Sequence, residues 1–90
     1  MTINEKFEQF DKKNPHVFKM FVDYALQAKS NGYDKFSAKA VFERLRWYYA
    51  FETTDYDFKL NNNYTAYYAR KAMGLVPELN GFFEIRERKV

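Results

Sequence analysis

One stretch of the chain combines residue types that recognise DNA with the spacing of a helical face. Asn63, Ala66, Tyr67 and Arg70 recur at i, i+3, i+4 and i+7, so a helix places them on one side, with Lys71 beside them. An amide and a guanidinium can each form paired hydrogen bonds with base edges in a major groove. This face is therefore either a DNA-contacting surface or an ordinary solvated face.

A helix over residues 63–75 must position these side chains. The asparagines at 61–63 can cap its first turn, because an amide oxygen accepts hydrogen bonds from free backbone N–H groups. The side of this helix that we expect to face the core carries Tyr64, Tyr68, Ala69, Ala72, Leu75 and Val76.

The distribution of charge favours the same part of the chain. The net charge of the 90 residues is only +3. Residues 35–51 carry four cations against one acid, and residues 61–76 carry two cations and no acid. A DNA-binding surface needs such a basic excess to contact phosphates. The cations that we assign to phosphate contacts are Lys39, Arg46 and Lys71.

Capping signals and apolar periodicity predict three further helices, over residues 3–11, 15–31 and 37–51. The residues expected to cap or end them are Thr2 with Glu5, Asn14 with Pro15, Gly32, and Ser37. We expect the first helix to brace the rest of the domain through its apolar side. Ten Phe, eight Tyr and one Trp supply rings to fill the core of so short a chain.

The predicted helix over residues 37–51 has two apolar sides. Its broad side carries Ala38, Val41, Phe42, Leu45, Tyr48 and Tyr49. Trp47 and Phe51, with Ala40, lie nearly opposite. Either this helix is central and covered on two sides, or Trp47 marks a site for a partner. In both cases we predict that Leu45 and Tyr68 are buried.

Alternating apolar and polar residues predict short strands near 56–60 and 82–88. We expect Phe58–Leu60 to pair with Phe83–Ile85. The predicted fold is therefore mostly α with a small β-sheet (α+β), in a single domain over residues 1–90.

Catalytic, metal and membrane sites are disfavoured. The chain has no cysteine, which excludes thiol chemistry and Cys-ligated metals, and its one imidazole, His16, stands at the start of a helix. Glu52, Asp55 and Asp57 could hold a divalent cation, but they lack the spacing of a calcium loop and fit a solvated loop better. No apolar run is long enough to span a membrane. We therefore expect no catalytic residue, metal or cofactor, and a cytoplasmic protein.

The order of elements, with the segment Asn61-Asn-Asn-Tyr-Thr-Ala-Tyr-Tyr-Ala-Arg70 and the strand 82–88, resembles the winged helix-turn-helix class. That resemblance implies a winged-helix-like fold with 63–75 as the recognition helix. Only one good strand follows Met73, whereas the wing of this class is a two-strand hairpin. The chain also resembles a family of small uncharacterised bacterial and phage-type proteins. The segments that carry this second likeness are Asn14-Pro15, Ala38–Trp47, Phe58–Asn63, Tyr68–Arg70 and Gly81–Arg86.

Two functions follow from these patterns. The leading hypothesis is a DNA-binding domain, in which Asn63 and Arg70 contact base edges and Tyr67 packs in the groove or on a sugar. The alternative is a small protein–protein interaction module without catalytic activity. In that case Trp47 and Phe51 would dock another protein or a second copy of the chain.

Overall fold

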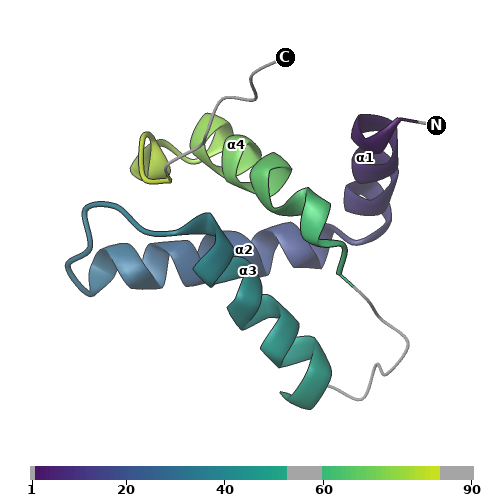
Figure 1. The fold of residues 1–90 in the computed structure, drawn as a ribbon. Coiled ribbons are helices and arrows are strands. Elements are labelled where there is room, and N and C mark those ends of the chain that lie inside the picture. Colours follow the sequence, from purple (N-terminus) through teal and green to yellow (C-terminus); the bar gives the residue numbers. More distant parts are fainter. Residues whose placement is uncertain (1, 53–59, 84–90) are drawn as a thin grey trace.

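Four α-helices and three short helical turns make up the described part of the chain. The computed structural model describes residues 2–52 and 60–83. The α-helices are α1 (Ile3–Lys13), α2 (Pro15–Ser30), α3 (Ala38–Trp47) and α4 (Thr65–Leu75). A π-helical turn, η1 (Tyr48–Glu52), continues α3, and 3₁₀ turns η2 (Asn62–Tyr64) and η3 (Pro77–Leu79) flank α4. Figure 1 shows α2 running across most of the molecule, with α1 at one end of it.

Three of the predicted helix boundaries are confirmed in detail. The Thr2 hydroxyl accepts a hydrogen bond from the Glu5 N–H at 3.2 Å, and the Glu5 carboxylate accepts one from the Thr2 N–H at 3.4 Å. This reciprocal pair is the capping box of α1. The Ser37 hydroxyl accepts from the Ala40 N–H at 3.2 Å and caps α3. Gly32, with φ of +100°, follows the end of α2 in the left-handed conformation that glycine adopts without strain.

The asparagine caps differ from the prediction. The Asn14 side chain donates to the Phe10 carbonyl at 3.0 Å, so it closes α1 and leaves the first turn of α2 uncapped. The Asn61 side chain accepts from the Asn63 N–H at 2.9 Å. That bond stabilises the 3₁₀ turn η2, and α4 begins only at Thr65.

The predicted α+β, winged-helix-like fold is wrong, because the described residues contain no strand and no sheet. Residues 56–59 and 84–88 of the two expected strands lie outside the described part of the chain. Phe83 forms an isolated parallel bridge with Phe36, and the Phe36 N–H donates to the Phe82 carbonyl at 3.1 Å. Leu60, the last residue of the segment that was expected to pair with Phe83–Ile85, is not in a strand. The two consecutive rings Phe82 and Phe83 are both buried, and this burial accounts for their apolar character without a sheet.

The core is built around Tyr68 of α4, which is completely buried. Its ring lies 4.9 Å from the ring of Phe7, 5.8 Å from that of Phe21 and 6.2 Å from that of Phe42, measured between centroids. These three rings come from α1, α2 and α3, so Tyr68 connects α4 to each of the other three α-helices. Leu45 of α3 is also fully buried. The burial predicted for both residues is therefore confirmed.

The predicted core side of α4 is correct except at its end. Tyr64, Tyr68, Ala69 and Ala72 are buried, but Leu75 is 65% exposed. The chain leaves the helix immediately after Leu75, at Val76. Among the described residues, Leu75 is left exposed at this end, whereas Ala72, one turn earlier, is completely buried.

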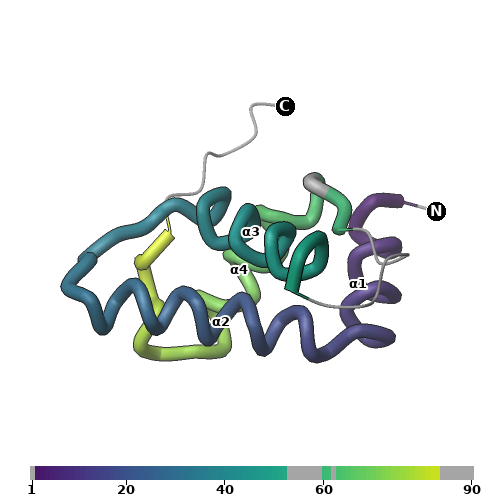
Figure 2. The backbone as a smooth tube through the Cα atoms, turned by 90° about the horizontal axis from the view of Figure 1, so that it is seen from below, coloured from purple at the N-terminus to yellow at the C-terminus, as the bar shows by residue number. Residues whose placement is uncertain are grey.

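The first helix braces the domain, as expected, through Phe7. Figures 1 and 2 both place α1 at the end of the molecule where α2 and α4 begin. The Phe7 ring packs on Tyr64, Tyr67 and Tyr68, with centroid distances between 4.9 and 5.5 Å. The contact joins the first helix to the last one.

Within residues 2–52 and 60–83, none of the helices combines the length and the apolar content needed to cross a membrane.

Candidate functional site

The face of α4 that was predicted to contact DNA is only partly open. Asn63 and Arg70 are exposed, whereas Tyr67 is half-buried. The Tyr67 ring stacks on the Phe7 ring at 5.1 Å, with 19° between the planes. The Arg70 guanidinium lies 5.9 Å from the Tyr67 centroid. One side of the Tyr67 ring is therefore already occupied by α1.

Lys71 is held within the fold by α1 and α2. Its ammonium forms an ion pair with Asp11, and it lies 4.3 Å from the centroid of the Phe18 ring. The side chains of Asp11 and Lys71 are 14% and 31% exposed. A phosphate would have to compete with this partly buried carboxylate for the same ammonium. Lys71 is thus better placed to attach α1 than to bind DNA.

The two predicted phosphate contacts on α3 belong to a different helix from Asn63, Tyr67 and Arg70. Lys39 is exposed. Arg46 is exposed as well, and its guanidinium lies 3.9 Å from the Glu43 carboxylate. Lys39 and Arg46 are seven residues apart, so they share one side of α3.

Trp47 and Phe51 form an exposed pair at the end of α3, which we call the aromatic ridge. Their ring centroids are 4.7 Å apart, and the side chains are 58% and 71% exposed. Among residues 2–52 and 60–83, no second layer covers this side of the helix, which does not fit the alternative of a helix covered on two sides. Tyr49, on the other side of the same segment, is buried.

The aromatic ridge stands on the π-helical turn η1. In a π-helix each N–H bonds to the carbonyl five residues earlier, which widens the turn, and such turns occur frequently at functional sites. Two hydrogen bonds hold the turn to α3. The Arg44 guanidinium donates to both oxygens of Glu52, at 3.1 and 3.3 Å. It also lies 5.0 Å from the centroid of the Tyr24 ring, which connects η1 to α2.

The other polar residues that the sequence singled out are not gathered into one cluster in the part of the chain that the structure describes. Of the three clustered acids, Glu52 is committed to Arg44, and Asp55 and Asp57 lie outside the described residues. His16 is exposed, and its ring lies 6.3 Å from that of Tyr49. In the described part of the chain, no group of three His, Cys, Asp or Glu residues is placed to hold a metal ion.

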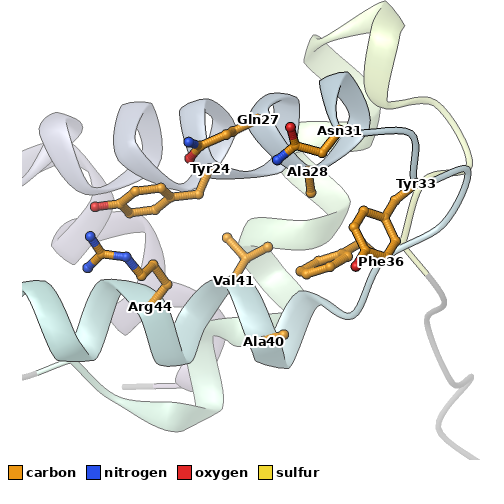
Figure 3. Close-up of a pocket in the computed structure, with 9 residues that line it drawn as sticks. All are labelled: Tyr24, Gln27, Ala28, Asn31, Tyr33, Phe36, Ala40, Val41 and Arg44. Carbon is orange, nitrogen blue, oxygen red and sulfur yellow. The ribbon is translucent and has the colours of Figure 1, made fainter.

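A groove between α2 and α3 was not foreseen from the sequence. It has a volume of about 300 Å³. Figure 3 shows Tyr24, Gln27 and Asn31 along the α2 side and Val41 and Arg44 on the α3 side. In the sequence, the only local feature that marks this groove is the spacing of Gln27 and Asn31, which are one helical turn apart. The groove itself depends on how two helices pack, which periodicity along one helix does not report.

The hydroxyl of Tyr68 is buried in the core. Burial raises the pKa of this hydroxyl above its usual value, and the negative charge of Asp11 raises it further. The hydroxyl has no hydrogen-bond partner among the described residues. A buried polar group without a partner destabilises a fold.

We therefore expect Tyr68→Phe to leave stability at pH 7 unchanged or to increase it by about 1 kcal/mol. The raised pKa also sets a pH dependence. Above about pH 10 the unfolded chain releases this proton while the folded chain retains it, so stability falls as the pH rises. Urea melts between pH 7 and 11 should show a smaller alkaline loss for Tyr68→Phe than for the wild type. Equal losses would contradict the raised pKa.

Comparisons with known proteins give no match, either to a protein-family model, to a curated protein or to a solved structure. The resemblances described above therefore remain predictions, and the function is argued from the geometry.

Proposed function

We propose that this chain is a non-catalytic protein-binding domain that docks a partner protein on the aromatic ridge. The observation that carries the proposal is the exposure of two large rings in mutual contact, Trp47 and Phe51, at 58% and 71%. Exposed apolar patches on small domains commonly mark sites of protein association. Trp is also among the residues that contribute most to binding energy at such interfaces.

The ridge is pre-organised for binding. Trp47 and Phe51 restrict one another, and the paired hydrogen bonds from Arg44 to Glu52 fix the turn that carries Phe51. A surface that is ordered before binding loses less conformational entropy on association. The π-helical turn thus places Phe51 beside Trp47.

The small size of the ridge favours a partner other than a second copy. Arg44 and Arg46, within one helical turn of Trp47, pair with Glu52 and Glu43, so the charges around the ridge are balanced. The complementary partner therefore offers an apolar pocket. Two ridges facing each other would bury only two large side chains from each copy. A stable dimer needs about 800 Å² from each partner. A pocket that encloses the ridge removes more of its surface from water.

DNA binding by α4 remains the competing prediction. Asn63 and Arg70 are available for it, but Lys71 is paired with Asp11 and Tyr67 is stacked on Phe7. The winged fold that supported it is not found in the described residues. Titration of labelled duplex at low salt discriminates the two functions. Association at tens of micromolar protein, lost in Arg70→Ala, would favour DNA.

Trp47→Ala should weaken binding of the partner by about 30-fold or more, because removal of a central aromatic anchor costs about 2 kcal/mol or more. The immobilised chain first captures its partner from a lysate of the source cells. The captured protein is then purified and titrated against the wild type and the variant by calorimetry. The emission of Trp47, the chain's one tryptophan, should shift to the blue as the partner covers it.

Leu75→Ala is the matched control, because Leu75 is a large apolar side chain, 65% exposed, on another helix. It should change the affinity by less than about threefold. Equal binding of the purified partner to wild type and Trp47→Ala would refute the proposal. The cytoplasmic location expected from the sequence stays a prediction.

A further inference from the structure

The groove between α2 and α3 has an apolar floor and two different ends. Val41 and Ala28, both buried, contribute to its lining between the helices. At one end the rings of Tyr33 and Phe36 meet edge to face, 5.0 Å apart with 74° between the planes. Arg44 lies at the other end, beside Tyr24 (Figure 3). The groove therefore provides apolar surface that extends from Tyr33 and Phe36 at one end to Arg44 at the other.

The groove is suited to a neutral occupant. Arg44 is the one charged side chain among the described residues that line it. Both oxygens of Glu52 already accept hydrogen bonds from its guanidinium. The remaining polar lining is formed chiefly by the side-chain amides of Gln27 and Asn31, which carry dipoles and no net charge. The complementary ligand is thus one with matching dipoles and no charge of its own.

The spacing of the two amides identifies such a ligand. Gln27 and Asn31 are four residues apart on α2, which corresponds to about 6 Å along the helix axis. Groups on the same side of an extended peptide recur every second residue, at about 6.8 Å. Each side-chain amide has a donor and an acceptor, as each peptide group has. In an extended segment the N–H and C=O of one residue point to the same side, and those of the residue after next follow on that side. Two alternate residues can therefore bond through their backbone to Gln27 and Asn31.

We propose that this groove binds an extended segment of polypeptide, about three residues long, from another protein. The segment lies along α2 with its backbone bonded to Gln27 and Asn31. One small apolar side chain packs on Val41, and a larger one packs against the Tyr33–Phe36 end. This site is separate from the aromatic ridge and does not depend on the function proposed for it.

A flat nucleobase is the other neutral occupant to consider. Stacking a base between two rings requires parallel planes, whereas Tyr33 and Phe36 are nearly perpendicular. Those two rings present one face and one edge, an arrangement that accommodates an aliphatic side chain better. The peptide is therefore favoured over the base.

The test begins with a displayed library of random heptapeptides, panned on the folded wild-type chain. We expect enrichment of sequences with apolar residues at alternate positions. A synthetic peptide of the selected sequence is then titrated into the ¹⁵N-labelled chain. The side-chain amide signals of Gln27 and Asn31 should shift on binding.

Variants then locate the bound peptide. The double variant Gln27→Ala/Asn31→Ala should weaken binding about tenfold or more, since two hydrogen bonds are lost. Gln9→Ala, which removes an exposed amide from α1, is the matched control and should have no effect. Ala40→Tyr adds a ring at an exposed position of the groove lining and should block binding while the chain stays folded.

Four results would overturn this proposal. The first is no enrichment of peptides over an unrelated helical protein, and the second is equal binding by the wild type and the double variant. The third is loss of peptide binding in Trp47→Ala. The fourth is a shift of the amide signals with adenosine instead of with peptides. The third result would place the peptide on the aromatic ridge. It would therefore separate failure of the groove from failure of the function proposed above.

Discussion

Replacement of Phe7 by alanine should destabilise the fold by about 3–5 kcal/mol, the usual cost of truncating a buried Phe. Phe7 is 7% exposed and packs on the rings of Tyr64, Tyr67 and Tyr68. It supplies much of the aromatic contact between α1 and α4. Denaturant melts measure the loss, and amide exchange should show that α1 loses more protection than α3.

Glu8→Ala is the control for this variant, because Glu8 is exposed on the same helix. It should change stability by no more than about 0.5 kcal/mol. A loss of less than 1 kcal/mol for Phe7→Ala would mean that α1 is not docked as described. The release of α1 would also uncover Tyr67 and free Lys71 from Asp11. If α4 binds DNA at all, its affinity for duplex should then rise.

Leu45→Ala should cost about 2–5 kcal/mol, since Leu45 is completely buried between α3 and the rest of the core. The range is wide because the cost depends on how far neighbouring side chains close the cavity. Urea unfolding monitored by circular dichroism measures it, with an unchanged slope as evidence that the native state is intact.

Lys39→Ala tests the opposite side of the same helix. Lys39 is exposed, so its truncation should alter stability by no more than about 0.5 kcal/mol. The difference in stability loss between Leu45→Ala and Lys39→Ala shows which side of α3 faces the core. If Leu45→Ala were as mild as Lys39→Ala, the assignment of buried and exposed sides would be reversed.

The starts of α1 and α3 were predictable from the sequence, because their signals are local. The capping box of Thr2 and Glu5 and the cap at Ser37 depend on residues only three positions apart. The phase of each helix followed from periodicity, which correctly placed Leu45 and Tyr68 inside. It failed at Leu75, where the end of the helix removes the neighbours that would have covered it.

The predicted sheet failed for a different reason. The alternation of apolar and polar residues near 82–88 is typical of a strand. The same pattern also occurs where a segment packs on helices without pairing. Phe82 and Phe83 are buried against the helical core, and Phe83 meets Phe36 in one isolated bridge. Which segment a short apolar run meets is a tertiary property, so alternation alone could not exclude the sheet.

The candidate sites were predictable only where one helix carries them. Periodicity separated Trp47 and Phe51 from the core side of α3 but left open whether they are covered, and the structure shows both exposed. It could not show that Tyr67 and Lys71 contact α1, because those contacts join residues far apart in the chain. The π-helical turn was also missed, since its residues are equally compatible with an α-helix.

The ion pair between Asp11 and Lys71 spans 60 positions of the chain, and this separation has a consequence for biosynthesis. At about 5–20 residues per second, about 3–12 s pass between the synthesis of Asp11 and that of Lys71. An isolated helix of eleven residues is marginal in water, so α1 has no stable structure of its own during this interval. Phe7 therefore meets its ring partners Tyr64, Tyr67 and Tyr68 only late in synthesis, when the start of α4 has been made.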